Sequence, residues 1–331
     1  MIREQTVNIG TLQLDCGVRL PDVEQRVTIY GTPEDDGSNV VLVEHALTGS
    51  SRAAEWWPGI AGDGALFDPK RWCIVGINAL GSCYGSTGPA SPAGNGKPFG
   101  ARFPRVTVAD IVRAELAALD RIGIARIDTV IGGSLGGMRA LQWALAAPER
   151  LRTAVVVGAH DHHSALGIAL NALQREAIAL DPRGGLRLAR KIAMLSYKSD
   201  ELLRLRHERR GDRLGKPRFD VEGYLEHQAD LFEARMDPQS YLALTHAMDS
   251  FDVRDSRMLR DSSEFVFVGI TSDWLFLAQD VRAAARRLTL RGARARYVQL
   301  RSNHGHDAFL AEASQLRELL EPFAGKVYCY D

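Results

Sequence analysis

The sequence lacks the features that mark membrane and secreted proteins. No apolar run approaches the ~18–20 residues that a bilayer span requires, and the first residues contain no apolar core of signal-peptide length. Cysteine is scarce: Cys16, Cys73, Cys83 and Cys329 are scattered without the spacing of a metal site or a disulfide framework. We therefore expect a cytoplasmic protein that has no membrane partner.

The chain also has no excess of either charge. Its 331 residues include 41 basic and 41 acidic side chains, so no global field draws it to nucleic acid. The one basic cluster, residues 204–218, is interpreted as a solvated helix end and loop. With 45% hydrophobic and 25% charged residues, the composition is typical of a globular protein with a sizeable core.

Apolar, β-branched runs alternate with helical periodicity at both ends of the chain. We predict strands at residues 26–31, 39–44, 72–78, 127–133, 151–159, 264–273 and 294–300. This alternation predicts a mostly parallel sheet with helices on both faces. Strand patterns are absent between residues 160 and 260, where the chain reads as helical. We therefore expect an α/β core made of residues 1–159 and 261–331, interrupted by a helical lid at 160–260.

A serine between glycine pairs lies where a predicted strand meets a predicted helix. Residues 132–136, Gly-Gly-Ser-Leu-Gly, match G-x-S-x-G, the tight turn that exposes a nucleophilic serine in α/β-hydrolase folds. This predicts Ser134 as the nucleophile. The N–H groups of Leu135 and of Leu47, which follows strand 39–44, are candidates for an oxyanion hole. His45, beside Leu47, is interpreted as structural.

A nucleophilic serine needs a base, and the base needs an orienting acid. Asp273 ends one predicted strand and His306 follows another, so both fall at the carboxyl edge of the sheet. The chain order Ser, Asp, His is that of α/β hydrolases. His304 is an alternative base that the sequence barely separates from His306, whereas Asp280 reads as the first turn of a helix.

Two other groups of side chains invite a functional reading. His160, His162 and His163 lie close together in sequence, but they match no ligand spacing that we recognise, so no metal is expected. We interpret them as polar residues beside the mouth of the active site. Tyr84, in a turn-rich segment, is a candidate for lining the substrate pocket.

Several segments together resemble the homoserine O-acetyltransferase family. They are "HALTG" (45–49), "LGSCYGSTGPASP" (80–92), "GGSLGGMRALQWA" (132–144), "VEGYLEHQADLFEARMDPQSYLALTHAMDSFDV" (221–253), "SDWLF" (272–276) and "GHDAFL" (305–310). The resemblance implies an α/β-hydrolase core with a helical lid through which two subunits pair. It further implies acetyl transfer from acetyl-CoA to L-homoserine in methionine biosynthesis, with no permanently bound cofactor.

The resemblance also assigns roles to individual residues. It implies Ser134 as nucleophile and Asp273 as acid, and it selects His306 rather than His304 as the base. It suggests that Arg175 meets the carboxylate of the substrate and Asp307 its ammonium group, a division of charge that suits a zwitterion. The alternative for Arg175 is a solvated position on a lid helix.

The chain departs from the family pattern around the acceptor pocket. Residues 181–191 lack the aromatic residues that relatives often carry, residues 49–57 differ, Glu44 stands where cysteine is common, and the chain is shorter than typical. Succinyl-CoA as donor and L-serine as acceptor therefore stay open. A serine ester hydrolase is the main alternative activity, and a non-catalytic binding protein is disfavoured by the complete candidate triad.

Overall fold

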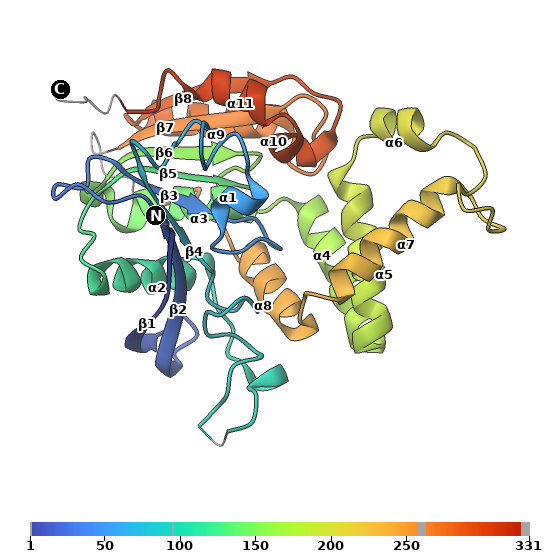
Figure 1. Ribbon diagram of the computed structural model, residues 1–331, viewed down its shortest axis with the longest axis horizontal. Helices are drawn as coiled ribbons and strands as arrows, with labels where there is room; N and C mark the ends of the chain where they lie inside the picture. Colours follow the sequence, from blue (N-terminus) through green and yellow to red (C-terminus); the bar gives the residue numbers. More distant parts are fainter. Residues whose placement is uncertain (1, 95, 257–262, 326–331) are drawn as a thin grey trace.

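The computed structural model describes residues 2–94, 96–256 and 263–325, and these form one eight-stranded sheet (Figure 1). Its spatial order is β1-β2-β4-β3-β5-β6-β7-β8. The strands are β1 (Ile2–Gln13), β2 (Arg19–Tyr30), β3 (Val40–Glu44), β4 (Cys73–Ile77), β5 (Ile127–Gly133), β6 (Leu151–Val157), β7 (Glu264–Ile270) and β8 (Arg294–Leu300). Strands β3 to β8 are parallel, whereas β1 and β2 pair antiparallel at one edge.

Helices cover both faces of this sheet, which confirms the predicted fold class. The larger core cluster packs α2 (Val108–Arg121), α3 (Leu135–Ala146) and α9 (Ala278–Leu290) against one face. The other face is covered by α1 (Ala53–Trp56), α10 (Ala308–Ala311) and α11 (Ala313–Leu320). Every residue of β3, β4 and β5 is buried, because a parallel strand between two helical layers has no solvent-facing side.

The N-terminal hairpin is the part of the sheet that the sequence analysis missed. Only residues 26–31 were predicted as a strand, but β2 begins at Arg19 and pairs along its length with β1. Most residues of β1 are exposed or half-buried, so β1 shows no continuous apolar run. An edge strand of this kind is held by its backbone pairing more than by burial, which explains the weak signal.

A group of helices lies between β6 and β7 in the sequence, although these two strands are neighbours in the sheet. These are α4 (Ala165–Leu180), α5 (Pro182–Tyr197), α6 (Asp200–His207), α7 (Asp220–Glu233) and α8 (Pro238–Asp249), called the helical insertion below. Figure 1 shows α4 to α7 projecting to one side of the sheet, with α8 nearer the core. Polar caps start four of these helices: Ser164 for α4, Asp181 for α5, Ser199 for α6 and Asp237 for α8. Within the described ranges, no helix is long and apolar enough to cross a membrane.

Candidate active site

Ser134 occupies a strained turn between β5 and α3. Its backbone lies at φ 58° and ψ −123°, a region that non-glycine residues rarely adopt. A Cβ atom at position 132 would lie 2.3 Å from the carbonyl group of Gly136, and one at position 136 would lie 2.1 Å from the carbonyl oxygen of Glu44. Both positions therefore require glycine, and the turn has the form of a nucleophile elbow.

Asp273 and His306 meet at the carboxyl edge of the sheet. The Nδ1 atom of His306 lies 2.7 Å from Oδ2 of Asp273, and both side chains are buried. The other carboxylate oxygen of Asp273 accepts the N–H groups of Leu275 and Phe276, each at 2.9 Å. The carboxylate is thus fixed by the backbone and in turn fixes the imidazole ring, as an orienting acid does for a catalytic base.

The remaining ring nitrogen of His306 is free to act on a substrate or on the serine. Its Nε2 atom is buried and has no hydrogen-bond partner among the described residues. Ser134 and His306 line the same cavity. The alternative base His304 lies beside Glu312, with 3.6 Å between Nδ1 and Oε1, and Asp280 lies in the first turn of α9.

The environment of His306 leads to a prediction about pH. Burial alone would lower the pKa of His306, but the charge and hydrogen bond of Asp273, with a contribution from Asp307, raise it above the ordinary value. His306 must be neutral to act as a base, so activity should fall as pH decreases through this raised pKa. We expect the acidic limb of kcat/KM against pH to have its midpoint above ~6.5, the value of unperturbed histidine. A midpoint below that of unperturbed histidine would contradict the arrangement.

The loop after β3 is held in place by His45. The Nε2 atom of His45 accepts the N–H of Ala79 at 2.9 Å, so Nδ1 carries the proton and donates to the carbonyl oxygen of Ala46 at 2.7 Å. Burial, together with the nearby charge of Arg139, lowers the pKa of His45 to about 3. A neutral histidine with both nitrogens engaged agrees with a structural role, and it fixes the backbone that leads to Leu47.

A fully buried ion cluster lies beneath the elbow. Arg139 of α3 forms ion pairs with Glu115 of α2 and with Glu44 of β3, and Trp143 donates to Glu115 at 2.8 Å. Arg139 also donates to the carbonyl oxygen of His45 at 3.3 Å. Burial raises the pKa of Glu44 well above its usual range, and the neighbouring Glu115 adds to this effect against the opposing charge of Arg139. Glu44 thus helps to join β3, α2 and α3 beneath the turn that holds Ser134.

Ser134 and His306 open onto a cavity of about 820 Å³. Leu47, Tyr84 and Asp307 line the same cavity. The Tyr84 hydroxyl accepts a hydrogen bond from Arg235 at 2.7 Å, and the Asp307 carboxylate lies 2.6 Å from the ammonium group of Lys198. Leu135 is the first residue of α3, where an N–H group has no partner within the helix. Ser134, His306 and Leu47 therefore line one cavity, and Leu135 directly follows Ser134 in the chain.

Comparisons with known proteins identify the family to which this chain belongs. A model of the α/β hydrolase fold matches residues 39–313. A homoserine O-acetyltransferase of Methanocorpusculum labreanum is 39% identical over 94% of this chain and 71% of its own length. The chain belongs to the homoserine O-acetyltransferase family. A member from Bacillus anthracis superposes with a TM-score of 0.90 over 99% of both chains at 20% identity, which shows the shared fold.

Relatives of this chain are named for transfer of different acyl groups. A homoserine O-succinyltransferase of Halothiobacillus neapolitanus is 37% identical over 96% of this chain and 88% of its own length. Its identity is close to that of the acetyltransferase from Methanocorpusculum labreanum. Overall similarity therefore identifies the family but does not distinguish acetyl-CoA from succinyl-CoA as the acyl donor.

The structure corrects the position expected for Arg175. This residue of α4 points toward α8, where its guanidinium lies 2.6 Å from the carboxylate of Asp249, and it does not line the cavity of Ser134. Arg190 of α5 lines the cavity instead. Its Nε atom is buried without a partner, and no carboxylate of the described ranges lies within 4.0 Å of it. The sequence analysis noted residues 181–191 only for their missing aromatics, and no local pattern distinguished Arg190.

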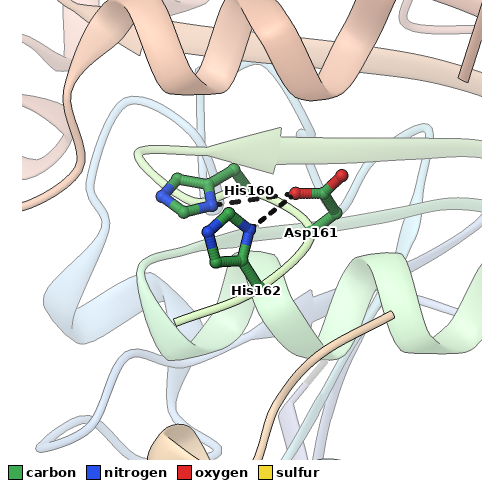
Figure 2. A group of neighbouring side chains, drawn as sticks. All are labelled: His160, Asp161 and His162. Carbon is green, nitrogen blue, oxygen red and sulfur yellow. Dashed lines mark hydrogen bonds and ion pairs between the residues drawn. The ribbon is translucent and has the colours of Figure 1, made fainter. Parts of the chain in front are cut away.

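The histidine cluster also lies elsewhere than expected. His160 is buried and does not line the cavity, so the interpretation as residues at the active-site mouth is wrong. Figure 2 shows the rings of His160 and His162 next to each other, with the Oδ1 atom of Asp161 3.0 Å from Nδ1 of His162 and 3.9 Å from Nδ1 of His160. Both carboxylate oxygens of Asp161 also accept hydrogen bonds from Arg287, at 2.7 and 2.8 Å. That guanidinium already neutralises the negative charge that the carboxylate would offer to a cation.

The histidine cluster nevertheless shares a neighbour, Phe276, with His306. The ring of Phe276 stacks on His306 at 5.2 Å, and His160 and His163 lie against the same phenylalanine at 5.5 and 5.6 Å. Burial lowers the pKa of both His160 and His163 to about 4, so they are neutral near pH 7. These rings therefore pack behind Phe276 without adding charge near His306.

Proposed function

We propose that this chain transfers an acetyl group from acetyl-CoA to the side-chain hydroxyl of L-homoserine, a step of methionine biosynthesis. One observation carries the proposal beyond family membership: a strained serine shares its cavity with a histidine whose Nε2 atom is buried and unpartnered. The His306–Asp273 pair orients that nitrogen from behind. Such an arrangement suits a base that serves two hydroxyl groups in turn.

The reaction then follows a ping-pong course. His306 accepts the proton of Ser134 as the serine oxygen attacks the thioester carbonyl, and the N–H groups of Leu47 and Leu135 stabilise the oxyanion. The C–S bond breaks, and the proton on His306 passes to the leaving thiol. The homoserine hydroxyl next gives its proton to His306 and attacks the acetyl-serine, and Ser134 regains a proton as it leaves. Asp273 stabilises the imidazolium in both halves.

The acceptor is held by one cation and one carboxylate. Arg190 is the cavity-lining guanidinium with an unpartnered buried nitrogen, and it is our candidate for the homoserine carboxylate. Asp307 adjoins His306 and is our candidate for the ammonium group, which would compete with Lys198 for the same carboxylate. A zwitterion held at both ends places its side-chain hydroxyl reproducibly against the base.

The assignment of Arg190 is testable by substitution. Loss of a charge-assisted hydrogen bond in Arg190→Met should raise the KM for L-homoserine roughly 10- to 100-fold. The KM for acetyl-CoA should change much less. Arg183→Met is a matched control, because Arg183 belongs to the same helix, α5, but has a side chain that is 87% exposed. Equal KM values for L-homoserine in wild type and Arg190→Met would remove Arg190 from the acceptor site.

The function itself is tested by measuring thiol release from the donor. Release from acetyl-CoA is compared without acceptor, with L-homoserine and with L-serine, and the series is repeated with succinyl-CoA. Strong stimulation by L-homoserine with acetyl-CoA is the expected result. Slow release that no amino acid stimulates, together with rapid cleavage of simple acetate esters, would instead establish the alternative, a serine ester hydrolase.

Three further properties belong to this proposal. Acetyl-CoA acts as a substrate, and no permanently bound cofactor takes part. The protein works in the cytoplasm as a homodimer paired through the helical insertion, which acts as a lid. Large apolar side chains exposed on the insertion support the pairing, among them Leu166, Leu173, Leu180, Leu188, Leu195 and Leu231.

A further inference from the structure

The cavity of Ser134 has an exposed end that the acetyl-transfer mechanism does not use. Ser134 is 6% exposed, whereas the side chain of Arg52, which lines the same cavity, is 50% exposed. Arg26 and Trp56 also line it. The cavity thus runs from a buried reaction centre to an open rim that carries arginines and an indole ring.

One carboxylate forms ion pairs with both arginines of this rim. Glu4 of β1 accepts from Nε of Arg52 at 2.6 Å and also forms an ion pair with Arg26 of β2. The hydrogen bond from Arg52, together with that from Arg26 and both positive charges, lowers the pKa of Glu4 against the opposing effect of burial. Glu55 also lines the cavity and lies 3.4 Å from Arg52. Over the whole cavity, the guanidinium groups of Arg26, Arg52, Arg190 and Arg235 outnumber the carboxylates of Glu55 and Asp307.

Trp56 presents an aromatic surface beside these charges. Its ring stacks on Trp57 with 5.3 Å between centroids, and its Nε1 atom donates to the carbonyl oxygen of Ser50 at 2.9 Å. Both contacts fix the orientation of a partly exposed indole that lines the cavity. An ordered aromatic ring next to arginines is suited to bind a heterocyclic base that carries phosphates.

We propose that Arg52, Arg26 and Trp56 bind the phosphate-bearing nucleotide part of the acyl-CoA donor. This inference rests on the proposed function and extends it to the donor site. The thioester carbonyl must reach Ser134 at the buried end of the cavity, so the charged nucleotide at the other end of the donor has to lie toward the open rim. That rim carries two guanidinium groups, and guanidinium groups bind phosphate oxygens in a fork geometry.

The inference is tested by comparing donors with and without the nucleotide. For Arg52→Gln, the ratio of the KM for acetyl-CoA to the KM for S-acetylpantetheine should rise about tenfold, the effect of one lost charge-assisted contact. Arg254→Gln is the matched control, because the Arg254 side chain is also 50% exposed and ion-paired but lies outside the cavity. A ratio that stays at the wild-type value in Arg52→Gln would overturn the inference.

A second measurement separates this inference from the proposed function. CoA, dephospho-CoA and pantetheine are compared as inhibitors of p-nitrophenyl acetate cleavage, which needs the serine but no acceptor. CoA should inhibit wild type more strongly than pantetheine, and Arg52→Gln should lose most of that advantage. Equal inhibition of wild type by CoA and pantetheine would overturn the donor site even if acetyl transfer occurs. A retained preference for CoA in a protein that transfers no acetyl group would support the site and contradict the function.

Discussion

Replacement of Ser134 with alanine should reduce acetyl transfer to L-homoserine by roughly 10⁴- to 10⁶-fold. The variant loses the oxygen that carries the acetyl group, and no other nucleophile is placed by the elbow. The fold should persist, because Ser134 is fixed through its backbone: its N–H donates to the carbonyl oxygen of Val157 at 2.9 Å. The measurement is thiol release from acetyl-CoA in the presence of saturating L-homoserine.

The control for this experiment is Ser250→Ala. Ser250 loses a hydroxyl at the end of α8, outside the cavity, and should retain wild-type turnover. Thermal unfolding of both variants checks that any loss of activity comes from the missing hydroxyl and not from a less stable fold. Turnover of Ser134→Ala within tenfold of wild type would contradict an acetyl-serine intermediate.

The second large effect is expected for Asp273→Asn, with a loss of roughly 10³- to 10⁴-fold in kcat. The N–H groups of Leu275 and Phe276 require an acceptor, so the amide oxygen of the asparagine should stay where Oδ1 of Asp273 lies. Its NH₂ group would then face Nδ1 of His306 and compel that nitrogen to accept. The proton moves to Nε2, and the histidine can no longer take a proton from Ser134.

Asp280→Asn provides the comparison for this variant. Asp280 lies in the first turn of α9 and has no role in the cavity, so its substitution should leave kcat near the wild-type value. The measurement is the steady-state kcat of each variant at its own pH optimum, compared with that of wild type. If Asp273→Asn retained more than a tenth of wild-type kcat, Asp273 would not be the orienting acid.

The residues of the candidate reaction centre could be predicted from the sequence because most of their signals are local. A G-x-S-x-G turn between a strand and a helix needs only a few consecutive residues. Gly132 is required by its contact with Gly136 inside that turn, whereas Gly136 is required by its contact with Glu44 of β3. Asp273 and His306 are 33 residues apart, but both follow parallel strands whose carboxyl ends meet at one edge. The strand order brings them together without further information from the sequence.

The candidate substrate-binding residues were harder to predict because they depend on which face of each helix turns toward the cavity. Arg175 and Arg190 both lie on helices of the insertion, and sequence periodicity does not say which helix face meets the core. The structure directs Arg175 to Asp249 and Arg190 to the cavity. The long-range pairing of Glu44 with Arg139 is similar, since it joins a strand and a helix 95 residues apart.

The most direct test of the account is the mass of the intact protein after mixing with acetyl-CoA and no acceptor. Wild type should gain the mass of one acetyl group on Ser134, and L-homoserine should remove that mass while O-acetylhomoserine appears in equal amount. Ser134→Ala should gain no mass. Production of O-acetylhomoserine by a protein that is never acetylated, or an acetylated protein that L-homoserine does not discharge, would contradict transfer through an acetyl-serine.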